Sequence, residues 1–168
     1  GGVLITNNSE LASKLKHLSS TAKIPHPWEF DHDEIAWNDR LPNLNAALGC
    51  AQLEVIENRL LVKKKLFDFY KNSLNHLTEI DFISGTSCLV TNNWLITLYL
   101  KFDEVSRLKT ERYDLLDQAH KRNLLLRPLW KPLHKLGIYN NAPRGSLCYA
   151  ENFEFRIINL PSSPQLIN

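Results

Sequence analysis

The longest regular run of apolar positions extends from Asn43 to about His76. Apolar or small residues recur there every three or four positions, which is the spacing of one helix face, and Lys63 interrupts them. A helix over this range would be roughly 50 Å long, which exceeds the width of a small domain. We therefore expect one long helix that bridges two domains or crosses a dimer interface.

Before this range the pattern predicts a strand, a helix and an extended loop. Residues 3–6 are mostly apolar and are expected to form a short buried strand. Asn7 and Glu10 have the spacing of a capping box and predict the start of a helix. Pro25 and Pro27 then favour extended chain, because the residue before a proline avoids helical geometry.

After this range the pattern predicts a small α+β unit. The expected elements are strands over 79–83 and 94–100, a helix from Thr110 to about Arg122, an edge strand over 124–126 that Pro128 ends, and a last helix from Ser146 through Ile157. The alternation over 94–100 is the clearest strand signal. We expect Asn123 to be the C-terminal cap of the helix over 110–122.

An amide and a guanidinium stand two positions apart just before the long helical range. Alternate side chains of an extended segment point the same way, so Asn38 and Arg40 can face one target. Pro42 suits the first turn of a helix, whose free N–H groups favour anions. The pair is therefore a candidate phosphate site. The alternative is that Asn38 caps the helix and Arg40 is a solvated charge.

The loop before this pair is crowded with histidines, aromatic residues and acids. His26, His32 and Asp33 are residue types that bind metals, but their spacing matches no standard ligand pattern, so we predict no metal site. The aromatic residues, Trp28 and Trp37 among them, are expected to anchor the loop against a cleft or a subunit contact.

A second group of cations and aromatic residues lies in the loop over 127–144. Arg127, Trp130 and His134 are suited to hold a nucleotide diphosphate, a base or a sugar. The alternative is a polar surface loop that Trp130 pins. His134 by itself is more often a structural hydrogen-bonding residue than an acid or base.

Composition narrows the class of protein. A net charge of +2 over 168 residues gives no reason to expect a nucleic acid or a membrane as partner. Three cysteines, odd in number and far apart, fit neither a disulfide framework nor a zinc site, and they suggest a reducing, cytoplasmic compartment. No apolar run approaches the roughly 20 residues of a membrane helix. The absence of methionine and the Gly-Gly start directly before an apolar strand suggest a piece of a longer protein.

Four segments carry a resemblance to a known family. Residues 37–54 read WNDRLPNLNAALGCAQLE, and this resembles the N-x-R-[LM]-x-N-[LI]-x-A-A-[LI]-G-x-x-Q-L segment of the DegT/StrS sugar aminotransferases. The other marks are GGVLIT at the start, RPLWKPLH from Arg127 and NLPSSP from Asn159. In addition, HPWEFDHD over 26–33 is similar to the branch that makes 4-amino sugars on the route to legionaminic-type nonulosonic acids.

The resemblance implies a fold and a division of the chain. The fold class is α/β, as the C-terminal part of an aspartate-aminotransferase-like (fold type I) enzyme that uses pyridoxal 5′-phosphate (PLP). Residues 1–42 would end the large PLP-binding domain and form the cofactor and substrate loop, 43–76 would be the bridging helix, and 77–168 a small α+β domain. The family's PLP-binding lysine would lie upstream of Gly1, so no catalytic residue is expected here and the fragment alone is expected to be inactive.

The resemblance also implies roles for particular residues. Asn38 matches the asparagine that reaches across the dimer to the PLP phosphate of the neighbouring site, and Arg40 matches the arginine that meets the substrate's phosphates there. Arg127, Trp130 and His134 fall where the family's small domain covers the nucleotide-sugar.

The activity that the resemblance implies is transfer of an amino group from glutamate to a nucleotide-linked 4-keto-6-deoxy sugar, in bacterial surface-polysaccharide or nonulosonic-acid biosynthesis. The cofactor would be PLP, and a homodimer would share its active sites. Ala36 and Asp39 depart from the family, which usually has Gly and Tyr there. Two alternatives remain: a non-catalytic relative that binds or senses sugar nucleotides, and a structural module built on the long helix.

Overall fold

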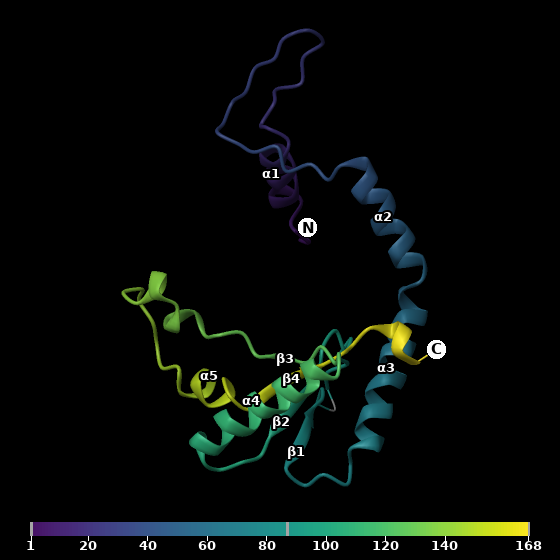
Figure 1. Ribbon diagram of the computed structural model, residues 1–168. Coiled ribbons are helices and arrows are strands. Elements are labelled where there is room, and N and C mark those ends of the chain that lie inside the picture. The colour runs from purple at the N-terminus through teal and green to yellow at the C-terminus, as the bar shows by residue number, and fades with distance from the viewer. Residues whose placement is uncertain (1, 87, 168) are drawn as a thin grey trace. The chain divides into compact units, whose positions relative to one another are not determined.

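The computed structural model describes residues 2–86 and 88–167. The chain divides into two compact units, Gly1–Glu54 and Val55–Asn168, which we call the N-terminal unit and the C-terminal unit (Figure 1). The boundary falls inside the range that the sequence predicts as one helix. None of the helices in the described ranges combines the length and apolarity needed to cross a bilayer.

Two helices, not one, occupy that range. Helix α2 spans Asn43–Glu54 and helix α3 spans Ile56–Ser73. Between them Val55 has φ −112° and ψ 6°, which is outside helical geometry. Its carbonyl accepts the amide of Arg59 and so begins α3. The expectation of one continuous bridging helix is therefore wrong. The spacing of apolar residues continues across Val55, but the helical backbone geometry is interrupted there.

An antiparallel sheet of four strands, in the order β1-β2-β4-β3, forms the centre of the C-terminal unit. The strands are β1 (Ile80–Ile83), β2 (Ile96–Leu100), β3 (Arg127–Pro128) and β4 (Ile157–Leu160). Leu98 lies opposite Ile158, and Ile96 lies opposite Leu160. Every residue of β4 is buried, as expected of a central strand covered on both faces.

Helices α3 and α4 (Val105–Lys121) contribute to the core on one face of the sheet. The largest fully buried side chains are Leu66 of α3, Leu108 of α4, Ile96 of β2 and Ile158 of β4. One contiguous apolar cluster therefore joins both helices to both central strands.

Two polar side chains fasten α3 to the chain after β4. The Lys63 ammonium donates to the carbonyls of Ser162 at 2.7 Å and Trp94 at 3.1 Å, and burial lowers its pKa. The Tyr70 hydroxyl donates to the carbonyl of Pro161 at 3.1 Å, and burial raises its pKa. Lys63, which interrupts the apolar pattern of the helix, thus has a structural role through these two hydrogen bonds.

Several elements differ from the prediction in extent or type. Helix α4 begins at Val105, ahead of Thr110. Its C-cap is Arg122, one residue before the predicted Asn123, which follows with a left-handed φ of 58°. The predicted edge strand lies slightly later, as β3. The last α-helix, α5 (Cys148–Phe153), is shorter than predicted, and Ile157 opens β4 instead of extending that helix.

The N-terminal unit departs from the prediction at its start. Val3, Leu4 and Ile5 are exposed and form no strand, since none of the described residues pairs with their backbone. Helix α1 (Ser9–Ser19) does form, and its capping residue is Asn8, whose side chain accepts the amide of Leu11.

Candidate functional site

The segment that carries Asn38 and Arg40 lies against the end of α1 within the N-terminal unit. The Trp37 amide donates to the Leu18 carbonyl at 3.0 Å, and the Trp37 carbonyl accepts the Thr21 amide at 2.9 Å. The Asp39 amide donates to the Ser19 carbonyl at 2.9 Å. These backbone bonds fix the position of the segment without an apolar core.

A left-handed turn after α1 makes this arrangement possible. Thr21 and Ala22 have φ values of 71° and 48°, a conformation that costs a branched side chain about 1–3 kcal/mol. Ala22 is fully buried, and its amide donates to the His17 carbonyl at 2.9 Å. Its carbonyl accepts the Asp33 amide at 3.3 Å. The surrounding contacts therefore hold a strained turn beside the site.

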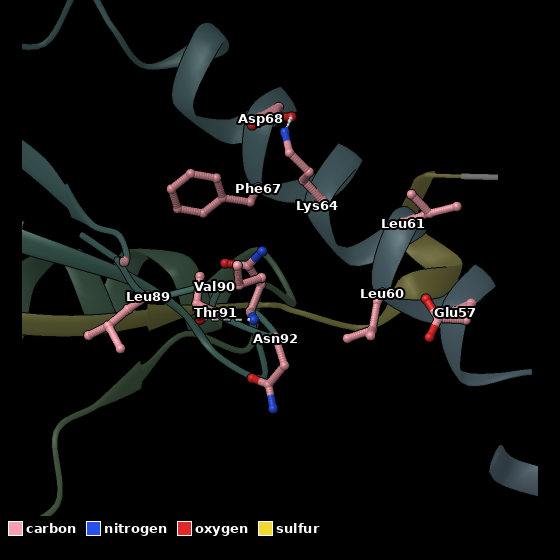
Figure 2. A pocket seen from close by; sticks show the side chains of 12 residues that line it. Glu57, Leu60, Leu61, Lys64, Phe67, Asp68, Leu89, Val90, Thr91 and Asn92 are labelled. Carbon is pink, nitrogen blue, oxygen red and sulfur yellow. Dashed lines mark hydrogen bonds and ion pairs between the residues drawn. The ribbon is translucent and has the colours of Figure 1, made fainter. Parts of the chain in front are cut away.

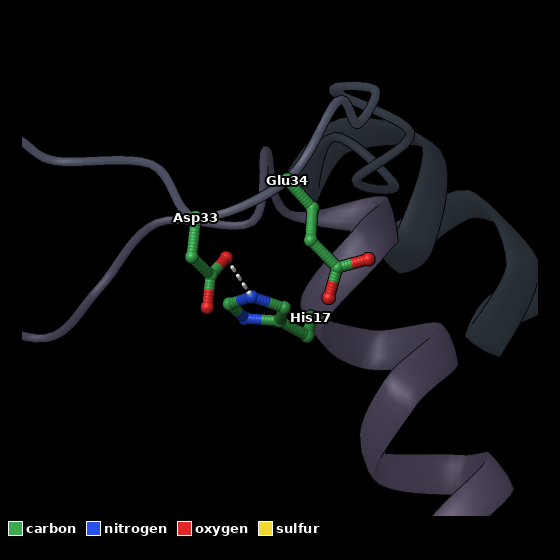
Figure 3. Close-up of side chains that lie close together, drawn as sticks. All are labelled: His17, Asp33 and Glu34. Atoms are coloured by element: carbon green, nitrogen blue, oxygen red, sulfur yellow. Dashed lines mark hydrogen bonds and ion pairs between the residues drawn. The ribbon is translucent and has the colours of Figure 1, made fainter.

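Two side-chain pairs reinforce the same junction, and Figure 3 shows the one between His17 and Asp33. His17 Nε2 lies 2.6 Å from Asp33 Oδ1, and this hydrogen bond holds the pKa of Asp33 below its ordinary value of 3.8. Lys14 of α1 forms an ion pair with Glu34. Residues that are far apart in sequence thus join α1 to the extended chain before Asn38.

His17, Asp33 and Glu34 place their potential metal-binding atoms within 4.8 Å of one another. These atoms already have partners in His17–Asp33 and Lys14–Glu34, and a lysine ammonium beside a carboxylate disfavours a cation. His32, one of the two histidines that the sequence singles out in the loop before Asn38, has a separate contact: its Nδ1 lies 2.6 Å from the carbonyl oxygen of Thr21.

Asn38 and Arg40 are both exposed. Asn38 forms an isolated backbone bridge with Ser20, and no hydrogen bond joins its side chain to the described residues. Arg40 Nη2 donates to the Ser20 carbonyl at 3.4 Å, and no carboxylate of the described chain lies within ion-pair distance of it. The amide and most of the guanidinium donors therefore remain available to an anion.

The alternative role for Asn38 as a helix cap is wrong. Helix α2 begins at Asn43, and the Pro42 carbonyl accepts the amide of Ala46 at 3.0 Å, so the cap position is Pro42. The segment that holds Asn38 thus ends before the helix begins.

Arg40 lines a hollow of about 490 Å³ in the N-terminal unit. The lining residues are Ser20, Lys23, Pro25, His26, Pro27 and Arg40. Asn38 is not among them. The structure therefore associates Arg40 with two basic residues that sequence reasoning did not connect to it.

The structure does not bring Arg127, Trp130 and His134 into one pocket. Arg127 lines a hollow of about 240 Å³ beside Asn159. His134 lines another hollow, of about 410 Å³, and its Nε2 lies 3.1 Å from Glu151 Oε1. Trp130 is exposed and lines neither. Their contact with a substrate stays a prediction.

A further groove of about 550 Å³ in the C-terminal unit has no counterpart in the sequence reasoning. Figure 2 shows its lining, with α3 on one side and the chain before β2 on the other. Leu61, Leu89 and Val90 are exposed there, and Lys64 pairs with Asp68 at 2.5 Å. Exposed apolar residues in two separated segments carry no periodic signal from which the groove could have been predicted.

Comparisons with known proteins match the whole chain. The sequence model of the DegT/DnrJ/EryC1/StrS aminotransferase family matches residues 1–168. EpsN of Bacillus subtilis (strain 168), named as a pyridoxal phosphate-dependent aminotransferase, is 35% identical over 99% of this chain and 42% of its own length. GDP-perosamine synthase of Escherichia coli O157:H7 is 28% identical over 100% of this chain and 43% of its own length.

Among solved structures, Helicobacter pylori PseC, an aminotransferase of pseudoaminic acid biosynthesis, matches with a TM-score of 0.81 and 23% identity. The match covers 96% of this chain and 43% of PseC. This likeness confirms the predicted α/β fold as a portion of a sugar-aminotransferase fold. The chain spans less than half the length of each of these proteins.

Proposed function

Because this chain belongs to the DegT/DnrJ/EryC1/StrS aminotransferase family, we propose that it is the C-terminal part of a PLP-dependent nucleotide-sugar aminotransferase. The observation that carries the proposal is the pair of exposed donors, Asn38 and Arg40, on a segment that backbone hydrogen bonds hold in place. An amide and a guanidinium that have no carboxylate partners and stand on a fixed backbone are suited to bind phosphate.

The donor set fits PLP through its phosphate. Asn38 would hold the cofactor phosphate of the neighbouring subunit's site, and Arg40 would hold the phosphates of the substrate beside it. When bound, PLP accepts the amino group and passes it to the sugar carbon. The residues of this chain bind and orient these anions, and the bonds of Trp37 and Asp39 to α1 fix the direction of their segment.

The finer parts of the proposal concern the parent protein. Its substrate is a nucleotide-linked 4-keto-6-deoxy sugar, its amino donor is glutamate, and it works in the cytoplasm as a homodimer with shared sites. GDP-perosamine synthase and PseC, as named relatives, support a sugar substrate of this class. The similarity of residues 26–33 to the legionaminic-type branch supports a role in nonulosonic-acid biosynthesis.

The test of Asn38 uses the full-length protein. Asn38→Ala should weaken PLP retention about tenfold, because hydrogen bonds to a charged phosphate are lost. Retention is measured from PLP absorbance after dialysis. Asn45→Ala, an exposed asparagine of α2, is the matched control and should retain PLP as the wild type does. Unchanged PLP affinity in Asn38→Ala would remove this residue from the site.

The reading frame upstream of Gly1 separates this proposal from its alternative. A PLP enzyme requires the family's Lys-x(n)-Gly-x-Gly-Gly turn there, with the lysine that binds the cofactor. A frame in which another residue replaces that lysine favours the non-catalytic, sugar-nucleotide-binding relative. The fragment without the lysine is expected to be inactive by itself.

A further inference from the structure

The hollow beside Arg40 carries three hydrogen-bond donors from separate positions of the N-terminal unit. Lys23 follows the left-handed turn, His26 lies in the loop between two prolines, and Arg40 ends the extended segment. The hollow has a volume of about 490 Å³ and is open to solvent. Besides these donors its lining includes Ser20, Pro25 and Pro27, and it is more polar than the groove beside α3.

The contacts of His26 indicate which ring nitrogen donates when the imidazole is neutral. Its Nδ1 accepts the amides of Glu29 at 3.0 Å and Trp28 at 3.4 Å. A neutral imidazole that accepts at Nδ1 carries its proton on Nε2 and donates from there. The Glu29 carboxylate lies 3.8 Å from Nδ1, on the side of the ring that is already engaged. His26 therefore presents a donor without needing a positive charge.

The two cations of the hollow are positioned differently. Lys23 is half-buried, and its ammonium lies 4.1 Å from the centroid of the Phe30 ring, which restrains a long side chain. No carboxylate of the described residues forms an ion pair with it. The Nη2 of Arg40 donates to the Ser20 carbonyl, and its other N–H groups donate to none of the described residues. A point charge and a planar fork together suit two adjacent phosphates.

We infer that Lys23 and His26 join Arg40 in binding the diphosphate of the nucleotide-sugar, a role that rests on the proposed function. Arg40 binds one phosphate through its fork, Lys23 neutralises the other, and the Nε2–H of His26 donates to a diphosphate oxygen. In this arrangement the hollow receives the diphosphate of the substrate, whereas Asn38, which does not line it, holds the cofactor phosphate.

The experiment titrates UDP and GDP into the full-length, PLP-loaded protein by calorimetry. Lys23→Gln should weaken binding of both nucleotides about tenfold, because a charge-assisted hydrogen bond is lost. Lys16→Gln is the matched control, since this exposed lysine of α1 lies outside the hollow. It should bind UDP and GDP as the wild type does.

A pair of substitutions separates binding from loop structure at His26. His26→Asn keeps an acceptor near the position of Nδ1 and removes the Nε2 donor, so it should weaken nucleotide binding while the loop stays folded. His26→Gln keeps a donor near Nε2 and should restore most of the affinity. Amide hydrogen exchange of Glu29 reports the loop in both variants.

Two results would overturn the inference. Unchanged dissociation constants for UDP and GDP in Lys23→Gln and His26→Asn would remove both residues from the site. Loss of PLP from Lys23→Gln with unchanged nucleotide binding would assign the hollow to the cofactor phosphate instead. Failure of the proposed function is a separate observation, because a wild-type protein that retains no PLP and transfers no amino group can still be titrated with both nucleotides.

Discussion

The two units of this chain are stabilised in different ways. The C-terminal unit closes an apolar core between its sheet, α3 and α4. In the described part of the N-terminal unit, Ala22 is the one buried apolar residue, whereas Ile35 and Leu44 are 93% and 81% exposed. Backbone hydrogen bonds around a strained turn hold this unit together. The comparison teaches that a segment with exposed hydrogen-bond donors can be fixed locally without a core of its own.

Helix α2 makes the contrast sharper. None of its residues is buried, although leucines and alanines are frequent along it. A helix with apolar residues on several sides is normally covered by further protein. Helix α3 contains four lysines and no alanine, yet it contributes Leu66 and Phe67 to the core. Burial in these two helices therefore does not follow from how apolar each sequence is.

The largest expected effect is on the core of the C-terminal unit. Ile158→Ala removes a fully buried side chain from β4 and should lower the free energy of unfolding by about 3–4 kcal/mol. Leu48→Ala, at an exposed position of α2, should change it by no more than about 0.5 kcal/mol. Urea unfolding of the 168-residue chain measures both. Equal losses would break the comparison between the units.

An intermediate effect is expected at the polar contact of α3. Lys63→Met leaves the carbonyls of Trp94 and Ser162 without their donor and should cost about 1–3 kcal/mol. Lys65→Met, at an exposed position of the same helix, should be neutral within about 0.5 kcal/mol. The same unfolding measurement checks both variants. If they behave alike, Lys63 does not fasten the helix.

The smallest expected effect is local and depends on pH. The His17 hydrogen bond lowers the pKa of Asp33, so the folded state favours the ionised carboxylate. The resulting stabilisation is present above the ordinary value of 3.8 and is lost as the pH falls through the lowered value.

Amide exchange of Thr21 and Trp37, relative to intrinsic rates, should therefore quicken as the pH falls below 3.8. Asp33→Asn should abolish this change, and Asp31→Asn should preserve it. A pH dependence that persists in Asp33→Asn would show that other groups control the junction.

Prediction from sequence worked where one face of an element is buried. The alternation through Ile96, Leu98 and Leu100 predicted β2, because those side chains share the core face. It failed for β4, since a strand buried on both faces shows no alternation, and Ile157 has helical spacing to Phe153. The break at Val55 was missed because a backbone angle leaves no trace in apolar spacing.

The candidate site was predictable only in part. The spacing of Asn38 and Arg40, together with the family resemblance, identified the segment. The His17–Asp33 bond joins residues 16 positions apart, and Lys23 lines the same hollow as Arg40 after a turn with positive φ values. Contacts of this kind arise from the folded path of the chain, which local patterns do not report.

The shortest strand protects the sheet against aggregation through one of its edges. At the outer edge of the sheet, β3 consists of Arg127 and Pro128, and both are exposed. Proline has no N–H to donate to another strand, and burying the charge of Arg127 against a second chain would be costly. This edge therefore pairs poorly with a second polypeptide. Replacing Pro128 with a residue that has a backbone N–H would therefore open a route to aggregation through this edge.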